Sequence, residues 1–133
     1  MLDLLSFDID SLRKIGQGSS RTVLELGPDA VLKLSREGSD FGSDPNRWEV
    51  ENWLRAEDEG WSELLCPILG WADDYSWLIM ARATPLRFGD EPNTSCEEWL
   101  GMCSFLEWQG IEDLHPANFG SFEGRAVALD YAT

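Results

Sequence analysis

The chain has 133 residues, of which 43% are hydrophobic and seven are tryptophans, so it can bury the core of one domain. Its 25 acidic residues outnumber ten basic ones, and the net charge of −15 repels phosphate backbones and anionic lipids, so we expect neither nucleic-acid nor membrane binding. Charge repulsion also disfavours a compact state unless salt screens it, which favours a salt-loving host. An ordinary acidic cytosolic or viral protein is the alternative.

Cysteine and histidine usage argues against a disulfide framework or a zinc site. Cys66, Cys96 and Cys103 lack Cys-x-x-Cys spacing, and the chain has one histidine. The N-terminal stretch MLDLLSFDID carries acids where a signal peptide carries bases, and no apolar run approaches the roughly 18 residues of a membrane span. We therefore expect a cytoplasmic protein, of a halophilic prokaryote or its virus.

The first half of the chain is predicted to be rich in strands. Residues 12–35 alternate short apolar runs with glycine and a Gly-Pro-Asp turn at 27–29, which favours three antiparallel strands. Next, Asp44 is a good N-cap before Pro45 at the first helical position, and this predicts a helix through about Glu59.

The second half mixes strands with one helix. Residues 66–83 read as a hairpin that turns at Asp73 and Asp74 and ends in an apolar strand. A second helix is expected to open at residues 94–95, where two glutamates complete capping boxes, and to end at Gly110. The tail predicts a hairpin that turns at residues 123–124.

Two features of the predicted strands are candidates for phosphate binding. Gly16-Gln17-Gly18 lies between two strands, where missing side chains let backbone N–H groups approach phosphate, although most such pairs only make a turn. Lys33 lies in the apolar run AVLKLS, where a buried ammonium needs an anion. The alternative is an edge-strand lysine whose head reaches water.

The helix predicted after Asp44 offers one inward-facing acid. Glu49 is four residues before Trp53 and shares its face, whereas Glu51 shares a face with Arg55. We therefore expect Glu49 to face inward and Glu51 to be solvated. In the alternative, every glutamate of this charge-rich helix is surface charge.

Four polar residues near the C-terminus have the chemistry of a catalytic loop. Asp113, His115 and Asn118 lie in GIEDLHPANFG, which follows the predicted helix stop. Asp and Asn oxygens suit magnesium, and an Asp can accept a hydroxyl proton, with an Asx-rich turn as the alternative. Asp130 ends an apolar strand, where a carboxylate is unexpected unless it meets a cation, caps something or lies exposed.

Taken in order, these features resemble the protein-kinase-like superfamily: Gly-x-Gly, strand lysine, helix glutamate, hairpin, helix, Asp-x-x-x-x-Asn, and an Asp that closes a short hairpin. DLHPAN resembles the catalytic loop of aminoglycoside phosphotransferases, choline kinases and related atypical kinases, which often carry histidine where protein kinases place lysine. The stretch also resembles small kinase-like proteins of phages and prokaryotes. The likeness covers about residues 15–131 and is strongest over 111–130.

The resemblance implies an ATP and magnesium site. The two glycines would cover the phosphates, and the strand lysine would contact the α and β phosphates while pairing with the helix glutamate. Residues 80–83 would form the hinge beside adenine. The implied nucleotide-binding residues are Gly16, Gly18, Lys33, Glu49, Met80 and Arg82.

The resemblance also assigns roles in the loop. Asp113 would orient or deprotonate the acceptor hydroxyl, while Asn118 and Asp130 would hold magnesium. His115 would donate to the γ-phosphate, or would only brace the loop. These two roles for His115 stay open.

Three departures accompany the likeness. Arg21 occupies the position of the usual third glycine, so the loop would lie higher or use the guanidinium on phosphate or an acidic partner. Asp-Tyr-Ala at 130–132 replaces Asp-Phe-Gly. The sequence also ends at Thr133, before an activation segment and later helices. Either a partner or second copy supplies these parts, or the acceptor is small, or transfer has been lost.

The expected fold class is α+β, a minimal kinase-like fold. About residues 10–80 would form an N-lobe-like antiparallel sheet with one helix, 81–84 the hinge, and 85–133 a truncated C-lobe of one helix, catalytic loop and hairpin. The leading function is an ATP- and magnesium-dependent phosphotransferase of unknown acceptor. The alternatives are an inactive kinase-like module that binds nucleotide or protein, and an interaction protein that uses tryptophans as anchors.

The second predicted helix carries more apolar residues than one inward stripe accommodates. We therefore expect part of it to remain exposed and to serve self-association or a protein partner. These residues are Trp99, Met102, Phe105, Leu106 and Trp108.

Overall fold

The computed structural model describes residues 11–17, 20–36, 41–85, 96–112 and 114–132. The chain divides into two compact units. The first unit comprises Met1–Arg47 and Ile68–Arg82, and the second comprises Trp48–Pro67 and Ala83–Thr133. Candidate residues lie in both units.

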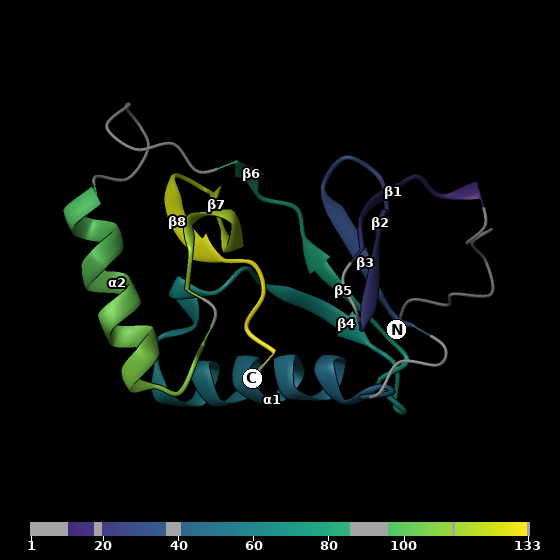
Figure 1. The fold of residues 1–133 in the computed structure, drawn as a ribbon, viewed down its shortest axis with the longest axis horizontal. Coiled ribbons are helices and arrows are strands. Elements are labelled where there is room, and N and C mark those ends of the chain that lie inside the picture. The colour runs from purple at the N-terminus through teal and green to yellow at the C-terminus, as the bar shows by residue number, and fades with distance from the viewer. Residues whose placement is uncertain (1–10, 18–19, 37–40, 86–95, 113, 133) are drawn as a thin grey trace. The chain divides into compact units, whose positions relative to one another are not determined.

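The first unit contains a five-stranded antiparallel sheet in the order β1-β2-β3-β5-β4 (Figure 1). This confirms both the three strands expected over 12–35 and the hairpin expected over 66–83. The strands are β1 Lys14–Gln17, β2 Arg21–Glu25, β3 Ala30–Ser35, β4 Ile68–Trp71 and β5 Trp77–Ala81.

The core of the first unit follows from cross-strand pairing. Leu24, Leu32 and Ile79 stand opposite one another on β2, β3 and β5, and all three are buried. Directly opposed side chains on one face of a sheet are within contact distance, so this apolar row stabilises the three central strands together.

Helix α1 spans Asp44–Glu59, as the Asp44-Pro45 signal predicts. Its buried Asn46 belongs to the first unit and donates to the carbonyl oxygens of Lys33 at 3.3 Å and Tyr75 at 3.0 Å. Since buried polar groups need hydrogen-bond partners, these bonds fix the start of α1 against strand β3 and the β4–β5 turn.

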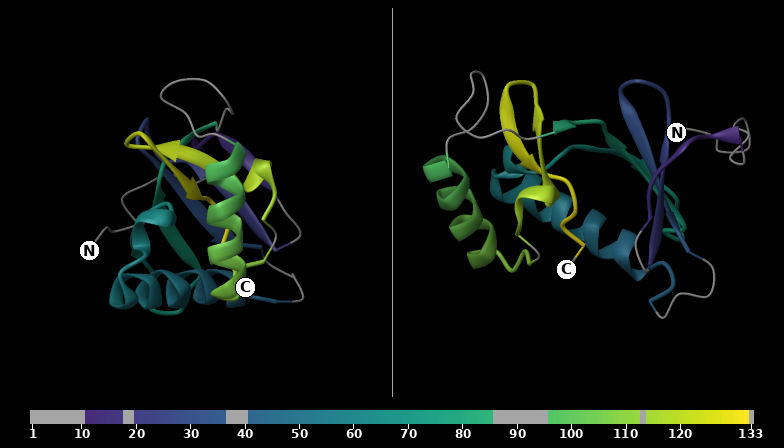
Figure 2. Two further views of the ribbon diagram at one scale, coloured as in Figure 1. Left: turned by 90° about the vertical axis from the view of Figure 1, so that its left-hand side faces the viewer. Right: turned by 45° about the horizontal axis from the view of Figure 1, so that its top comes forward.

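The second unit contains the rest of α1, helix α2 and a three-stranded sheet in the order β6-β7-β8. Figure 2 shows α2 beside the β7–β8 hairpin from two further sides, and the rings of Trp99 and Phe119 meet edge-on at 5.8 Å between centroids. The elements are the short helix η3 Ser62–Leu64, β6 Thr84–Pro85, α2 Cys96–Trp108, the short helix η4 Pro116–Asn118, β7 Phe119–Phe122 and β8 Arg125–Ala128.

The β7–β8 hairpin turns where the sequence predicts it. Glu123 and Gly124 have φ values of 51° and 80°, the left-handed pair that a two-residue hairpin turn requires. A second constraint on the hairpin was not predicted: a Cβ added at Gly120 would lie 2.8 Å from Ala83 Cβ and 2.9 Å from the Thr84 carbonyl oxygen. Glycine at this position therefore lets β6 approach β7.

Helix α2 ends before Gly110, as expected, while residues 94–95 lie outside the described part of the chain. Gly110 has φ 87° and donates to the Glu107 carbonyl at 2.9 Å, and Ile111 N–H donates to the Leu106 carbonyl at 3.0 Å. These two bonds form a Schellman motif, whose usual apolar contact is supplied by the fully buried pair Leu106 and Ile111.

The faces of α2 differ in exposure, as its composition predicts. Leu106 is buried, whereas Leu100, Phe105 and Trp108 are 54%, 38% and 87% exposed.

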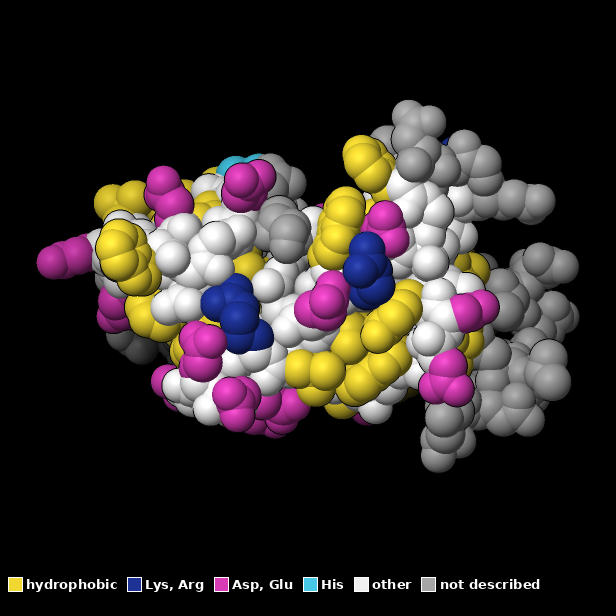
Figure 3. Space-filling model, turned by 90° about the horizontal axis from the view of Figure 1, so that it is seen from below, with side chains coloured by type: hydrophobic (Ala, Val, Ile, Leu, Met, Phe, Trp, Pro, Cys, Tyr) yellow, Lys and Arg dark blue, Asp and Glu magenta, His cyan; other side chains and the backbone are white. Residues whose placement is uncertain are grey.

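On the surface shown in Figure 3, acidic side chains are scattered among hydrophobic patches and are more widespread than basic ones. Among the described residues, no helix is long and apolar enough to cross a membrane.

Candidate functional site

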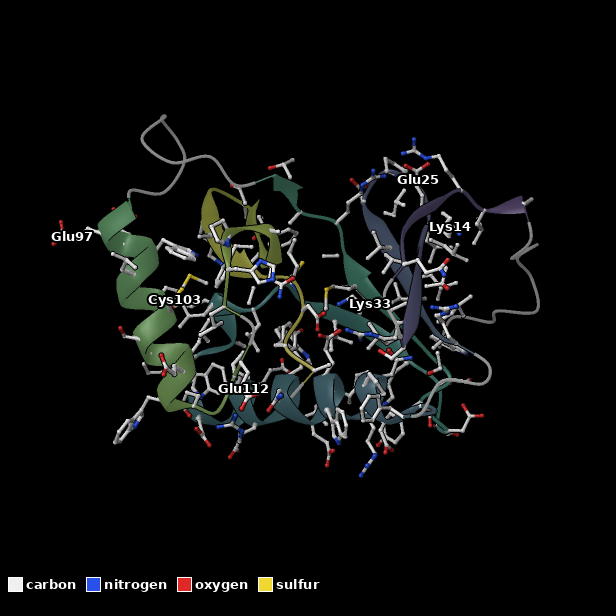
Figure 4. The ribbon with its side chains drawn as sticks, viewed as in Figure 1. Lys14, Glu25, Lys33, Glu97, Cys103 and Glu112 are labelled. Atoms are coloured by element: carbon white, nitrogen blue, oxygen red, sulfur yellow. The ribbon has the colours of Figure 1, made fainter. Side chains whose placement is uncertain are left out.

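The strand lysine lies inside the sheet of the first unit. Lys33 is on β3, which pairs with β2 on one side and β5 on the other, and its register partners are Val23 and Leu78 (Figure 4). It is 5% exposed. The alternative of an edge-strand lysine with its head in water is therefore wrong.

Gly16 lies on β1 opposite Val23, at a register shift in the β1–β2 ladder. An added Cβ would meet only the Val23 side chain, at 3.7 Å, which is ordinary contact. Packing alone therefore does not require glycine at this position. Gly18 lies outside the described residues.

Arg21, at the position of the usual third glycine, is buried. Its guanidinium donates to Asn46 Oδ1 at 3.2 Å, within the first unit. Asn46 thus accepts from Arg21 through its side-chain oxygen and donates through its amide nitrogen to the carbonyls of Lys33 and Tyr75. Arg21 is therefore part of the packing at the start of α1.

The two expected hinge residues have different surroundings. Met80 is buried on β5 opposite Val31. Arg82 forms an ion pair with Glu25, which Arg13 also contacts at 2.8 Å. Hydrogen bonds, first from Arg82 and then from Arg13, lower the pKa of the Glu25 carboxyl. The guanidinium of Arg82 is thus engaged within the first unit, and its role at a nucleotide stays a prediction.

In the second unit, the β7–β8 hairpin brings the two expected magnesium ligands to its open end. The last ladder pair is Phe119 with Ala128, and beyond it Leu129 N–H donates to the Asn118 carbonyl at 2.7 Å. Asp130 follows directly, and its Oδ1 accepts from Ala132 N–H at 3.3 Å. Asn118 therefore accepts this backbone hydrogen bond, and Asp130 follows its donor, Leu129.

The loop before this hairpin is partly described. His115 has extended backbone, is exposed, and its carbonyl accepts from Asn118 N–H at 2.9 Å, which closes the η4 turn. Its carbonyl thus braces the loop, but the bond involves no imidazole atom and leaves both roles of the side chain open. Asp113 lies outside the described residues.

Glu49 is fully buried and Glu51 is exposed, which confirms the predicted difference between them. Within the second unit, Glu49 Oε2 accepts a 2.6 Å hydrogen bond from the backbone N–H of Tyr131. Sequence reasoning anticipated Lys33 as the partner of this carboxylate. That pairing stays a prediction, and the backbone of Tyr131 is an additional partner.

Sequence reasoning missed two residues beside Glu49. Asn52, three residues further along α1, donates to the Tyr131 carbonyl at 2.7 Å. Tyr131 is itself fully buried, and its hydroxyl donates to the Cys66 carbonyl at 2.7 Å. The three-residue spacing of Glu49 and Asn52 was the available signal, since such residues share a helix face.

The donor chemistry at the hairpin fits magnesium. Among the described residues, no three His, Cys, Asp or Glu side chains gather where they could hold a metal ion. Magnesium at nucleotide sites needs fewer protein ligands, because one or two protein oxygens suffice when substrate phosphates and water complete the octahedral coordination. The Asn118 amide and the Asp130 carboxylate supply two such groups.

No protein-family model matches the sequence, and no curated protein matches it. Solved structures do match. One is described as the Legionella pneumophila Lpg2603 kinase bound to IP6, with a TM-score of 0.55 and 18% sequence identity over 92% of this chain. The chain spans 50% of the length of that kinase. This likeness shows a kinase-like fold, in agreement with the α+β class expected from the sequence.

Proposed function

We propose that this protein is an ATP- and magnesium-dependent phosphotransferase. The observation that carries the proposal is the hydrogen bond from Leu129 N–H to the Asn118 carbonyl, beside which Asn118 and Asp130 lie at one end of a hairpin. A kinase-like fold with two hard oxygen ligands at this point of the chain supports magnesium-nucleotide chemistry.

The four polar residues near the C-terminus each have a proposed task. Asn118 and Asp130 hold the magnesium ion, which when bound neutralises charge on the phosphates. Asp113 orients the acceptor hydroxyl and accepts its proton. His115, exposed beside this hairpin, donates a hydrogen bond to the transferred phosphoryl group, or braces the loop that carries Asp113.

The first unit supplies the proposed nucleotide contacts. Lys33 contacts the phosphates, because a buried lysine needs anionic partners. Gly16, which has no side chain, lets backbone N–H groups approach the phosphates. Gly18 belongs to the same proposed phosphate-binding loop, and Glu49, a residue of the second unit, is the proposed partner of Lys33. Backbone groups near Met80 and Arg82 bind adenine.

The test begins with magnesium-dependent ATP binding by calorimetry, at low and at multimolar salt, followed by ATP hydrolysis and autophosphorylation on the same sample. Asp130→Ala and Asn118→Ala should weaken magnesium-dependent affinity by roughly tenfold, about 1.4 kcal/mol, each. Asp113→Asn should keep affinity and lower turnover, because a base acts mainly on the barrier. Glu123→Gln, at the other end of the same hairpin, is the charge-matched control and should change neither.

Other outcomes favour the alternatives. Wild-type protein that binds ATP without any turnover is an inactive kinase-like nucleotide-binding module. Wild-type protein that fails to bind ATP at every salt concentration contradicts both readings, and leaves a protein-binding module of kinase-like fold.

A further inference from the structure

One face of α1 carries three polar side chains at three-residue spacing: Glu49, Asn52 and Arg55. Such residues are neighbours on a helix. Glu49 is fully buried, Asn52 is 8% exposed and Arg55 is half-buried. All three belong to the second unit, together with Tyr131 and Gln109, which they contact.

Glu49 and Asn52 form hydrogen bonds with both polar groups of the Tyr131 backbone. Tyr131 N–H donates to Glu49 at 2.6 Å, and Tyr131 C=O accepts from Asn52 Nδ2 at 2.7 Å. A residue held at N–H and C=O by one helix has little freedom to rotate its peptide planes. The residue immediately before it is Asp130, the proposed magnesium ligand.

The second part of the face continues the same network to the end of α2. Arg55 Nη2 donates to Asn52 Oδ1 at 3.2 Å and to the Gln109 carbonyl at 2.7 Å, and Nη1 donates to Gln109 Oε1 at 3.0 Å. The guanidinium also lies over the Trp61 ring, 5.0 Å from its centroid. Gln109 stands between α2 and the loop that carries Asp113.

We propose that Asn52 and Arg55 are positioning residues, which hold the magnesium-binding segment at Asp130 and the start of the Asp113 loop to one helix face. The inference rests on the proposed function. Asn52 is central, because its amide donates to Tyr131 while its oxygen accepts from Arg55. Losing either side chain removes one of the contacts that hold a segment to the helix, without removing a proposed ligand.

The variants are chosen to separate positioning from folding. Asn52→Ala removes both bonds of the amide. Arg55→Lys keeps the charge but loses the fork that reaches the Gln109 carbonyl and side chain together, and it is mild enough to fold if Asn52→Ala does not. Glu57→Gln changes an exposed charge on the same helix and serves as the matched control.

The main readout is the magnesium concentration that gives half-maximal ATP binding to the full chain. We expect Asn52→Ala to raise it several-fold, because the backbone next to Asp130 loses one of its two bonds to α1, and to leave magnesium-free ATP affinity unchanged. Arg55→Lys should lower kcat several-fold with little change in KM for ATP. The control should match wild type in both.

A second readout needs no nucleotide. Hydrogen exchange of the backbone at residues 129–132 should accelerate in Asn52→Ala, while exchange in β2 and β3 stays as in wild type. Equal slowing or speeding everywhere indicates a general stability effect and overturns the inference.

Different results would contradict the proposed function and the positioning role. If wild type shows no magnesium-dependent nucleotide binding, the proposed function fails and the positioning role falls with it. If wild type binds but both variants keep its magnesium dependence and its ratio of kcat to KM, the proposed function stands and the inference is overturned.

Discussion

The carboxylate of Glu49 accepts a hydrogen bond from the backbone N–H of Tyr131, a residue 82 positions later in the chain. Both groups are buried, and a buried backbone N–H without an acceptor costs about 1–3 kcal/mol. The bond therefore gives this glutamate a structural task besides its proposed pairing with Lys33, and the two tasks can be separated by substitution.

A double-mutant cycle on Lys33→Met and Glu49→Gln tests that pairing. Glu49→Gln keeps an oxygen for Tyr131 N–H while removing the charge. If the lysine and glutamate are paired, the free energy of unfolding should show a coupling of about 1–3 kcal/mol in urea denaturation. Additive effects, or coupling of Lys33 to Glu51 in a parallel cycle, contradict the ion pair.

Substitution by alanine should destabilise the protein at Gly120 but not at Gly16. Gly120→Ala places a Cβ 2.8 Å from Ala83 Cβ and should destabilise the protein by about 1–3 kcal/mol through overpacking. Gly16→Ala meets only ordinary contact and should stay within about 0.5 kcal/mol of wild type. Thermal melting of both variants checks the difference, and a tolerated alanine at 120 would show that β6 can move away from β7.

The Glu25 cluster should make stability depend on acidity. Arg82 and Arg13 lower the pKa of this carboxyl from its ordinary 4.5, so the folded state favours the charged form. Its contribution is present above the unfolded pKa and is lost as pH falls through the lowered folded value. Glu25→Gln should therefore flatten the decline of stability as the pH falls below the ordinary pKa of 4.5. Glu57→Gln is the control, and equal slopes in wild type and Glu25→Gln would contradict the effect.

The net charge of −15 should make the protein more stable in salt. Screening lengths fall from roughly 10 Å at 0.1 M to roughly 2 Å at 3 M, which removes most repulsion between surface acids. We expect the melting temperature to rise across this range. Sodium chloride is the salt to use first, with a flat or falling curve as the contrary result.

The exposed face of α2 should mediate association with a second copy or a protein partner. Trp108 is 87% exposed, and Phe105 is 38% exposed on the same helix. Trp108→Ser should reduce any self-association seen by sedimentation at high salt, where charge repulsion is screened. Leu69→Ser, which changes a 61% exposed residue on β4, is the control. A monomer at every concentration, with no partner found, would contradict this prediction.

Local signals made much of the fold predictable. Asp44 before Pro45, the glycine at 110 and the turn at 123–124 each act within a few residues, and each marks an element end in the structure. Strand β6, Thr84–Pro85, has only two residues, which is too short to carry a periodic pattern, so the sequence did not predict it.

The sequence predicted the buried position of Glu49 but not the residues that contact it. Helix spacing told which side of α1 carries Glu49, because that depends on 3.6 residues per turn. It could not tell what this side faces. The contacts of Asn52 with Tyr131 and of Arg55 with Gln109 join residues far apart in sequence, and no local pattern encodes such a pair.

The local origin of the β7–β8 hairpin bears on the order in which the site is assembled during folding. Hairpins close in about 1–10 μs, whereas joining segments separated by most of the chain requires a larger loss of loop entropy. Asn118 and Asp130 should therefore come together early, before Glu49 reaches Tyr131 across 82 positions. A folding chain would then hold the two proposed ligands together before helix α1 restrains the segment that follows them, and the proposed binding of magnesium and nucleotide would be completed only with the last long-range contacts.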